Sequence, residues 1–253
     1  MACAVNNFAL GGSGVRPAVV DTLLALLNAD LIPVVPREGS IGYITMMAHI
    51  ALVLMGNGEV HSGAATLPGA EALRRLGTSP LVLEAKEGLS LLNGTQAMLA
   101  CGILNLLQAE RLVEAAEVVG ALSLEALRGT PVAFDARLQE VRGQQGQITS
   151  AQRLRALIAG SAIRRSHLQC GRVQDAYSLR CMPQVHGAVR DTLEFVRATF
   201  AAEANAAVDN PLVFAGLRGG GEVLSGGNFH GEPLAYALDY CAIALCGLAG
   251  ISE

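Results

Sequence analysis

Residues 84–119 read EAKEGLSLLNGTQAMLACGILNLLQAERLVEAAEVV, a stretch dominated by leucine, alanine and glutamate. These residues have high intrinsic helix propensity, so the stretch predicts one long helix. We expect a weak point at Asn93-Gly94-Thr95, because glycine and β-branched threonine both lower helix propensity. Long helices rich in alanine and leucine pack closely against one another, and this stretch therefore favours a helix bundle.

The rest of the chain predicts further helices joined by short loops. Pro17 stands at a first-turn position, where proline is tolerated, and opens an apolar-periodic helix. Asp209-Asn210-Pro211 ends the second long helix, because a residue before proline is pushed out of the helical region. Helices are expected at 17–27, 46–55, 70–76, 183–208 and 232–251, loops at 129–147 and 216–231, and a strand at 222–224. We find no internal repeat and no linker, so the sequence predicts an all-α protein with a single helical unit over 1–253.

The composition limits the classes of partner. Of the 253 residues, 51% are hydrophobic and 16% are charged, an apolar excess that predicts surface buried against other subunits. The formal net charge is −4, and no basic stripe interleaves with aromatic side chains. We therefore expect an oligomer, and no nucleic acid as a partner.

Cysteines and apolar runs indicate the compartment. The six cysteines form no Cys-x-x-Cys pair and no secretory leader precedes them, so we expect buried, reduced thiols in a cytoplasmic protein. The longest apolar runs, 91–107 and 234–251, are interrupted by polar residues such as Asn105 and Asp239. They predict bundle-core helices and no membrane span.

Residues 173–185 read VQDAYSLRCMPQV and contain Gln174, Tyr177 and Arg180. A guanidinium matches the geometry of a carboxylate, and a phenol can take part in proton transfer. Taken alone, the tyrosine and the arginine favour a buried, hydrogen-bonded phenol and a structural ion pair.

Two further segments place asparagine beside glycine or proline. Residues 91–96 read LLNGTQ, and Asn93 costs stability in an apolar helix unless its amide has a partner. Taken alone, it favours a helix-packing asparagine. Residues 203–212 read EANAAVDNPL, and Asn210 is typical of an Asx turn that ends a helix.

Glycines crowd the segment before the last expected helix. Residues 225–233 read SGGNFHGEP and predict a glycine loop that carries Phe229. The Gly219-Gly220-Gly221 cluster is not a phosphate loop, because no Lys-Ser/Thr follows it. The histidines lack metal-ligand spacing, so no metal site is predicted.

Residues 36–42 read PREGSIG and lead through Tyr43 into an apolar helix. Taken alone, Gly39 to Gly42 predict a turn at the entry of that helix.

Together and in this order, these segments resemble the histidine, phenylalanine and tyrosine ammonia-lyase family, over essentially the whole chain from about Val5 to Glu253. The resemblance implies a long-helix bundle of the ammonia-lyase/fumarase-like type, of which this chain corresponds to the central portion only. The electrophile loop would lie near 39–45 and the core helix bundle over 84–253. The family's upstream tyrosine base and its downstream acidic residue, which reads the substrate side chain, are absent here.

The resemblance also implies roles for the segment 173–185. Arg180 would bind the α-carboxylate of the substrate. Tyr177 would take part in proton transfer or bind the released amine, and Gln174 would hydrogen-bond near the prosthetic group.

The other segments would complete the site. By the resemblance, Asn93 would hydrogen-bond the prosthetic carbonyl and orient the substrate. Asn210 would lie near the carboxylate, and Phe229 would pack beside the electrophile. Gly42 and Tyr43 would flank the electrophile itself.

The junction of Gly42 and Tyr43 departs from the family pattern. Family members carry Ala-Ser-Gly there, which cyclises into a self-derived 4-methylidene-imidazol-5-one (MIO) group, and this chain lacks the tripeptide. Two alternatives stay open. Either a mature MIO group is present that a sequence written in standard residues omits, or the group is lost. No metal or nucleotide cofactor is implied.

Within the family, FDAR at 134–137, VRGQQGQ at 141–147 and the stretch 166–173 look most like histidine ammonia-lyases. The implied reaction is elimination of ammonia from L-histidine to give urocanate, in a cytoplasmic homotetramer with shared active sites. The alternatives are a tyrosine or phenylalanine ammonia-lyase, an aminomutase, or a non-catalytic helical homologue or assembly subunit without MIO.

Overall fold

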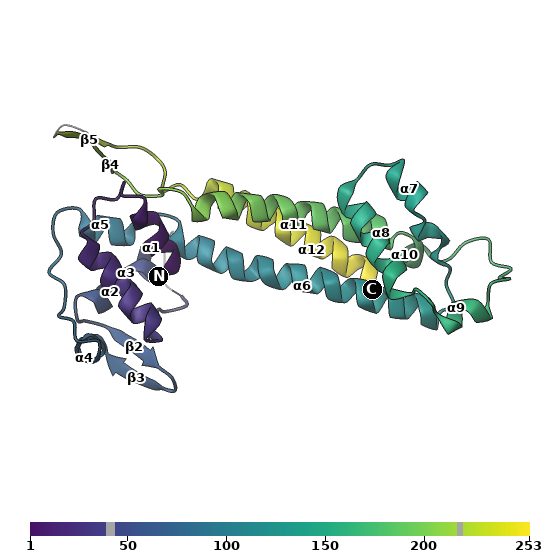
Figure 1. Cartoon of the computed structure of the whole chain (residues 1–253), viewed down its shortest axis with the longest axis horizontal. Helices are drawn as coiled ribbons and strands as arrows, with labels where there is room; N and C mark the ends of the chain where they lie inside the picture. The colour runs from purple at the N-terminus through teal and green to yellow at the C-terminus, as the bar shows by residue number, and fades with distance from the viewer. Residues whose placement is uncertain (39–43, 217–219) are drawn as a thin grey trace. The chain divides into compact units, whose positions relative to one another are not determined.

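The computed structural model describes residues 1–38, 44–216 and 220–253, most of which lie in helices (Figure 1). The helices are α1 (Ala2–Ala9), α2 (Pro17–Asn28), α3 (Ile44–Leu54), α4 (Gly69–Arg75), α5 (Glu87–Leu92), α6 (Gln96–Ala126), the 3-10 turn η1 (Pro131–Phe134), α7 (Ala136–Glu140), α8 (Gln145–Leu157), α9 (Ala162–Ser166), α10 (Tyr177–Arg180), α11 (Met182–Ala204) and α12 (Glu232–Ser252). The strands are β1 (Leu31–Pro33), β2 (Glu59–Ser62), β3 (Ala65–Pro68), β4 (Leu212–Ala215) and β5 (Gly221–Leu224). The predicted all-α class is confirmed, with short strands added to it.

The chain is divided into two compact units. The first comprises Met1–Gly102 with Phe200–Leu234, and the second Ile103–Thr199 with Ala235–Glu253. Helices α6, α11 and α12 each continue from one unit into the other. The single helical unit over 1–253 stays a prediction.

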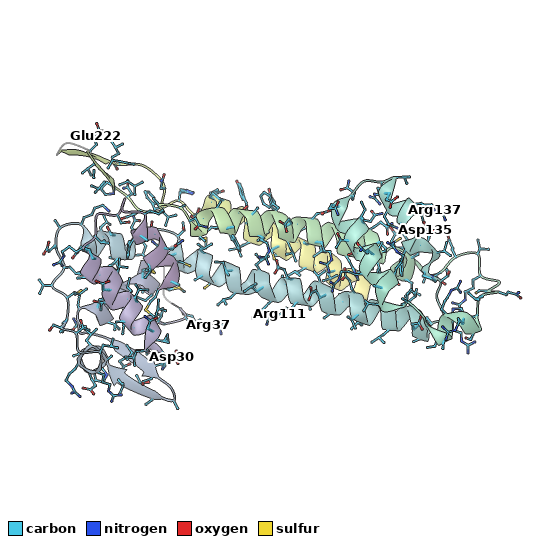
Figure 2. All side chains as sticks on the ribbon, in the orientation of Figure 1. Asp30, Arg37, Arg111, Asp135, Arg137 and Glu222 are labelled. Atoms are coloured by element: carbon cyan, nitrogen blue, oxygen red, sulfur yellow. The ribbon has the colours of Figure 1, made fainter. Side chains whose placement is uncertain are left out.

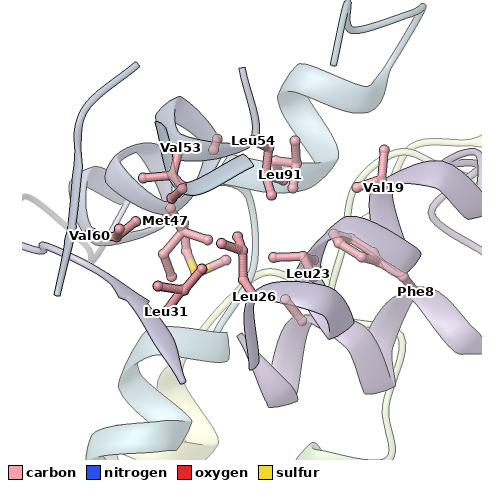
Figure 3. Packing of buried hydrophobic residues seen from close by; sticks show 14 residues of the cluster. Phe8, Val19, Leu23, Leu26, Leu31, Met47, Val53, Leu54, Val60 and Leu91 are labelled. Atoms are coloured by element: carbon pink, nitrogen blue, oxygen red, sulfur yellow. The ribbon is translucent and has the colours of Figure 1, made fainter. Parts of the chain in front are cut away.

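The first unit has a core of aliphatic side chains from α1, α2, α3, β1, β2 and α5. Figure 3 shows Leu26 of α2, Leu31 of β1 and Met47 of α3 close together in this core. Helix α2 begins at Pro17, which follows an extended Arg16, as the first-turn proline predicts. The antiparallel sheet β1-β2-β3, which we did not expect, adds Val60 to the core.

The long helix expected from 84 to 119 is interrupted. It forms α5 and α6, and the break lies at Asn93-Gly94-Thr95, the expected weak point. Asn93 is extended at φ −84° and ψ 145°, and Gly94 has φ +117°, a conformation that favours glycine. The continuous helix was wrong, because two consecutive residues take non-helical backbone conformations there.

The second unit contains most of α6 and α11 together with α7 to α10. A buried cluster that includes Leu124, Phe134, Leu154 and Leu179 joins α6, η1, α8 and α10. The loop expected at 129–147 is wrong, because η1, α7 and the start of α8 lie in it. The Asp135 side chain accepts a hydrogen bond from the backbone amide of Arg137 and caps α7.

The glycine-rich segment after α11 forms a hairpin. Strands β4 and β5 pair antiparallel, with Val213 opposite Val223, so the expected strand at 222–224 is confirmed. The cysteines are unpaired, but Cys101, Cys170 and Cys246 are exposed, so the expectation of buried thiols was wrong for these three.

Two apolar stretches are long enough to cross a membrane by length and composition alone. They are residues 87–126 and α12, with mean hydropathies of 1.2 and 1.7. The first stretch carries Glu117, a fully buried carboxylate that pairs with Arg153 and Arg190. A charged cluster at this depth is costly in a lipid-facing helix, so the structure favours the predicted bundle helix for this stretch.

Candidate active site

A cavity of about 260 Å³ opens in the first unit beside the described end of the electrophile segment. It is lined by Ile44, Asn93, Gly94, Thr95, Met98, Phe229, His230 and Gly231. Ile44 is the first described residue after the Gly42–Tyr43 junction, while both flanking residues lie outside the described ones. The cavity therefore brings Asn93 and Phe229 next to the segment that the family uses for its electrophile.

Asn93 reaches this cavity because the helix stops there. The residue caps the end of α5, and its Nδ2 donates to the backbone oxygen of Asn210 at 3.2 Å and to Oδ1 of Asp209 at 3.5 Å. The expectation that its amide needs a partner is confirmed, but the partners belong to the segment after α11. Asn93 and Asn210, which are distant in sequence, are thus in direct contact.

Asn210 in turn holds the loop that carries Phe229. Its Oδ1 accepts from the backbone amide of Gly226 at 2.6 Å and from Oγ of Ser225 at 3.3 Å. The ring of Phe229 is 41% exposed and lines the cavity. One asparagine side chain therefore links the segment after α11 to the glycine loop.

Two residues that sequence reasoning missed lie behind this contact. The ammonium of Lys86, at the start of α5, donates to Oδ2 of Asp209 at 2.6 Å. The Asp209 side chain is fully buried and that of Lys86 is 15% exposed. The sequence held one signal, since Lys86 is the single lysine among 18 lysine and arginine residues.

Tyr177 and Arg180 lie together in the second unit, on α10. The guanidinium carbon of Arg180 is 5.7 Å from the ring centroid of Tyr177, a cation–π contact. Nε of Arg180 is buried without a hydrogen-bond partner among the described residues, and Tyr177 is 70% exposed. A structural ion pair and a buried phenol, the two interpretations that a lone motif favours, are therefore both wrong within the described chain.

Gln174 lies at a different hollow of the second unit. This hollow of about 260 Å³ is also lined by Arg128 and Arg172. The neighbouring Asp175 is buried, and its carboxylate accepts from the backbone amide of Thr130 at 2.6 Å. Asp175 thus anchors the segment that carries Gln174. The Gln174 residue is exposed.

The candidate residues therefore form two groups, each described within its own unit. Asn93, Asn210 and Phe229 belong to the first unit, and Gln174, Tyr177 and Arg180 to the second. Within residues 1–38, 44–216 and 220–253, no group of three histidine, cysteine or acidic side chains could hold a metal ion.

The chain is similar to known proteins over its whole length. The model of the aromatic amino acid lyase family matches residues 1–253. Histidine ammonia-lyase of Koribacter versatilis is 54% identical, over 100% of this chain and 51% of that protein. The crystal structure of histidine ammonia-lyase from Trypanosoma cruzi has a TM-score of 0.87 at 39% identity, over 99% of this chain and 47% of that one. Tyrosine aminomutase from Streptomyces globisporus has a TM-score of 0.90 at 39% identity, over 98% of this chain and 50% of that one. The chain spans about half the length of the relatives that it matches.

Proposed function

The chain belongs to the aromatic amino acid lyase family, and we propose that it contributes the central part of a histidine ammonia-lyase, which eliminates ammonia from L-histidine to give urocanate. The observation that carries this proposal is the cavity beside Ile44, lined by Asn93 and Phe229. The 54% identity to a histidine ammonia-lyase over the whole chain supports histidine as the substrate.

The residues around the cavity fit an MIO group formed at the Gly42–Tyr43 junction. The lining offers an amide, an aromatic ring, an imidazole and two glycines, and no acid, lysine or arginine is among its described residues. Beside it, Oε1 of Gln96 is buried without a partner among the described residues. An uncharged ring of this kind would lie beside Asn93 and pack against Phe229, and it would supply the electrophile that turns the substrate amine into a leaving group.

Arg180 and Tyr177 supply the charged and protic groups of the proposed site. The unpartnered Nε of Arg180 leaves its guanidinium free to bind the α-carboxylate of the substrate. The exposed phenol of Tyr177 lies within cation–π distance of that guanidinium, so it can exchange a proton next to the bound carboxylate. Gln174 would hydrogen-bond near the prosthetic group, and Asn210 would lie near the substrate carboxylate.

We also propose a homo-oligomer, a tetramer with shared sites by the family resemblance, in the cytoplasm. The second unit exposes apolar side chains along its long helices, among them Leu104 and Leu122 of α6 and Ile243 of α12, which are 64%, 65% and 69% exposed. Burial of such a surface between subunits is favourable by about 25 cal/mol per Å². Association would also bring the two residue groups of different copies into one site.

An intact-mass measurement with an assay tests the proposal. We expect the mass to exceed that of the written sequence by the mass of the MIO group, and the protein to absorb as a conjugated imidazolone does. We expect urocanate from L-histidine, and neither coumarate from tyrosine nor cinnamate from phenylalanine.

The missing Ala-Ser-Gly favours one other function, a non-catalytic subunit that assembles with a full-length relative. A mass equal to the written sequence, with no product from any of the three amino acids alone or with such a relative, would overturn the lyase proposal. Product only in the presence of the relative would favour the assembly subunit.

A further inference from the structure

Lys86 is the only lysine of the chain, and the other 17 basic side chains of the lysine and arginine count are arginine. It has φ +70°, a left-handed conformation that is uncommon for a residue with a side chain. Its Nζ donates to Oδ2 of Asp209 at 2.6 Å, to Oγ of Ser90 at 2.8 Å and to the backbone oxygen of Ser13 at 2.9 Å. Three N–H groups meet three acceptors around one point, a geometry that an ammonium satisfies and a planar guanidinium does not.

Asp209 connects the ammonium of Lys86 to the cavity. Its carboxylate is fully buried, and its second oxygen, Oδ1, accepts from the backbone amide of Asn210 at 2.6 Å and from Nδ2 of Asn93 at 3.5 Å. A buried carboxylate without a cation would be costly, and the ammonium of Lys86 is the cation beside Asp209. A charged acceptor holds an amide donor more strongly than a neutral one does.

The acceptors around Asn93 also fix which end of its amide faces which way. Asp209 Oδ1 and the Asn210 backbone oxygen can only accept, so the nitrogen of the amide must face them. Both N–H groups of Asn93 then point at acceptors of this chain, so the hydrogen bond to a prosthetic carbonyl that the family resemblance implies is not open to them. The amide oxygen has no partner among the described residues, and it is the end left for a ligand.

We propose that Lys86 and Asp209 are positioning residues for the amino acid site. Their buried ion pair orients the Asn93 amide so that its oxygen accepts a hydrogen bond from the amino group of the bound substrate. Through Asn210, the same pair steadies the loop that carries Phe229. Only the identity of the ligand rests on the proposed lyase function, because the orientation of Asn93 is a property of this chain alone.

The matched control is the neighbouring ion pair of Arg16 and Glu87. Glu87 also lies at the start of α5 and is buried, and its carboxylate accepts from Nε of Arg16 at 2.8 Å and from Nη2 at 2.7 Å. None of its hydrogen bonds involves Asn93 or Asp209. Glu87→Gln therefore disturbs the same helix start without disturbing the orientation of Asn93.

The first experiment measures the side-chain amide of Asn93 by NMR in the full chain, with the signal assigned by its loss in Asn93→Asp. We expect the signal to shift in Lys86→Met, Lys86→Arg and Asp209→Asn, and to stay in place in Glu87→Gln. An unmoved signal in Lys86→Met, or an equal shift in Glu87→Gln, would overturn the positioning role whether or not the protein is a lyase.

The second experiment titrates L-histidine and urocanate against the same folded variants. We expect Lys86→Met and Asp209→Asn to weaken L-histidine binding about tenfold or more, as loss of outer partners does at other sites. Glu87→Gln should bind as the unmodified chain does, although its thermal midpoint falls. Equal affinity in Lys86→Met would refute the inference. If the unmodified chain binds neither compound, the ligand assignment fails, and the NMR result alone decides the role of Lys86.

Discussion

Two buried carboxylates with cationic partners, Glu117 in the second unit and Asp209 in the first, differ in what their oxygens contact. In the second unit, both oxygens of Glu117 are engaged by cations, since Oε2 accepts from Arg153 at 2.6 Å and from Arg190 at 2.7 Å, and Oε1 accepts from Arg190 at 2.8 Å. Oε1 also accepts from Ser150 at 2.7 Å. In the first unit, Asp209 has one cation, and its other oxygen faces the amide of Asn93.

The difference separates a structural centre from a positioning one. Burial by itself raises the pKa of Glu117, but hydrogen bonds from Arg190, Ser150 and Arg153 hold that pKa below its usual value. This centre ties α6 to α8 and α11 and leaves no oxygen for anything else. The oxygens of Asp209 connect a cation to a residue of the cavity. The group that contacts the second oxygen of a buried carboxylate therefore indicates whether the carboxylate is structural or positions another residue.

The largest expected effect comes from removing the charge of the structural centre. Glu117→Gln removes the buried counter-charge that Arg153 and Arg190 share, and we expect the free energy of unfolding to fall by about 3 kcal/mol. Urea unfolding measures this loss. Glu114→Gln is the control, because Glu114 is 56% exposed and lies 3.8 Å from Arg153, so we expect a loss below about 0.5 kcal/mol. Equal losses in the two variants would contradict the larger contribution of the buried carboxylate. Binding at the cavity should change in neither variant.

The next effect compares close packing in the two units. A Cβ at Gly146 of α8 would lie 2.1 Å from the backbone oxygen of Gly187, whereas one at Gly102 of α6 would meet the ring of Phe200 at 2.8 Å. Backbone cannot move aside as a side chain can, so we expect Gly146→Ala to lower the free energy of unfolding by about 2 kcal/mol, as measured by urea unfolding. Gly102→Ala should cost less, because the ring of Phe200 is a side chain that can shift away from the added methyl group. A larger loss in Gly102→Ala would show that Phe200 is as fixed as backbone.

Local signals predicted most of the helices because they act within a few residues. Pro17 opens α2 and Asn93-Gly94-Thr95 breaks the long helix, as expected. The helix expected over 183–208 ends earlier, at Ala204, so Asp209-Asn210-Pro211 does not end it. The loop at 129–147 was wrong because its glycines and glutamines concealed Asp135, which caps α7. The sheet β1-β2-β3 depends on pairing between segments, which propensity does not report.

The sequence predicted the residues that line the candidate site, but not the residues that position them. The resemblance gave Asn93, Asn210 and Phe229, and the structure describes all three in one unit with direct contacts among their segments. It gave no sign of Asp209 as a buried acceptor, because that role depends on Lys86, which lies 123 positions away in sequence. The scarcity of lysine is the one sequence feature that could have indicated this partner.

A smaller effect is expected from acid at the ion pair that serves as the control. Hydrogen bonds from the Arg16 side chain hold the pKa of Glu87 at about 2, below its ordinary 4.5. Above pH 4.5 the carboxylate is charged in the folded and the unfolded chain, so its stabilisation is fully present. As the pH falls from 4.5 towards 2, the unfolded chain takes up the proton first and stability declines. Unfolding free energies at several pH values should show a shallower decline in Glu87→Gln, and an identical decline would contradict this assignment.

The smallest effect is expected at an exposed pair of the second unit, labelled in Figure 2. Asp135 accepts from Nη2 of Arg137 at 2.8 Å, but the Arg137 side chain is 86% exposed. Water screens such a pair, and the cap of α7 uses the backbone amide of Arg137, which a substitution keeps. We therefore expect Arg137→Gln to change the thermal midpoint by less than about 1 °C. Asp135→Ala should lower it by more, because it removes the acceptor of that cap. If Arg137→Gln lowered the stability as much as Glu117→Gln does, burial would not be what separates the ion pairs of Glu117 and Asp209 from an exposed ion pair.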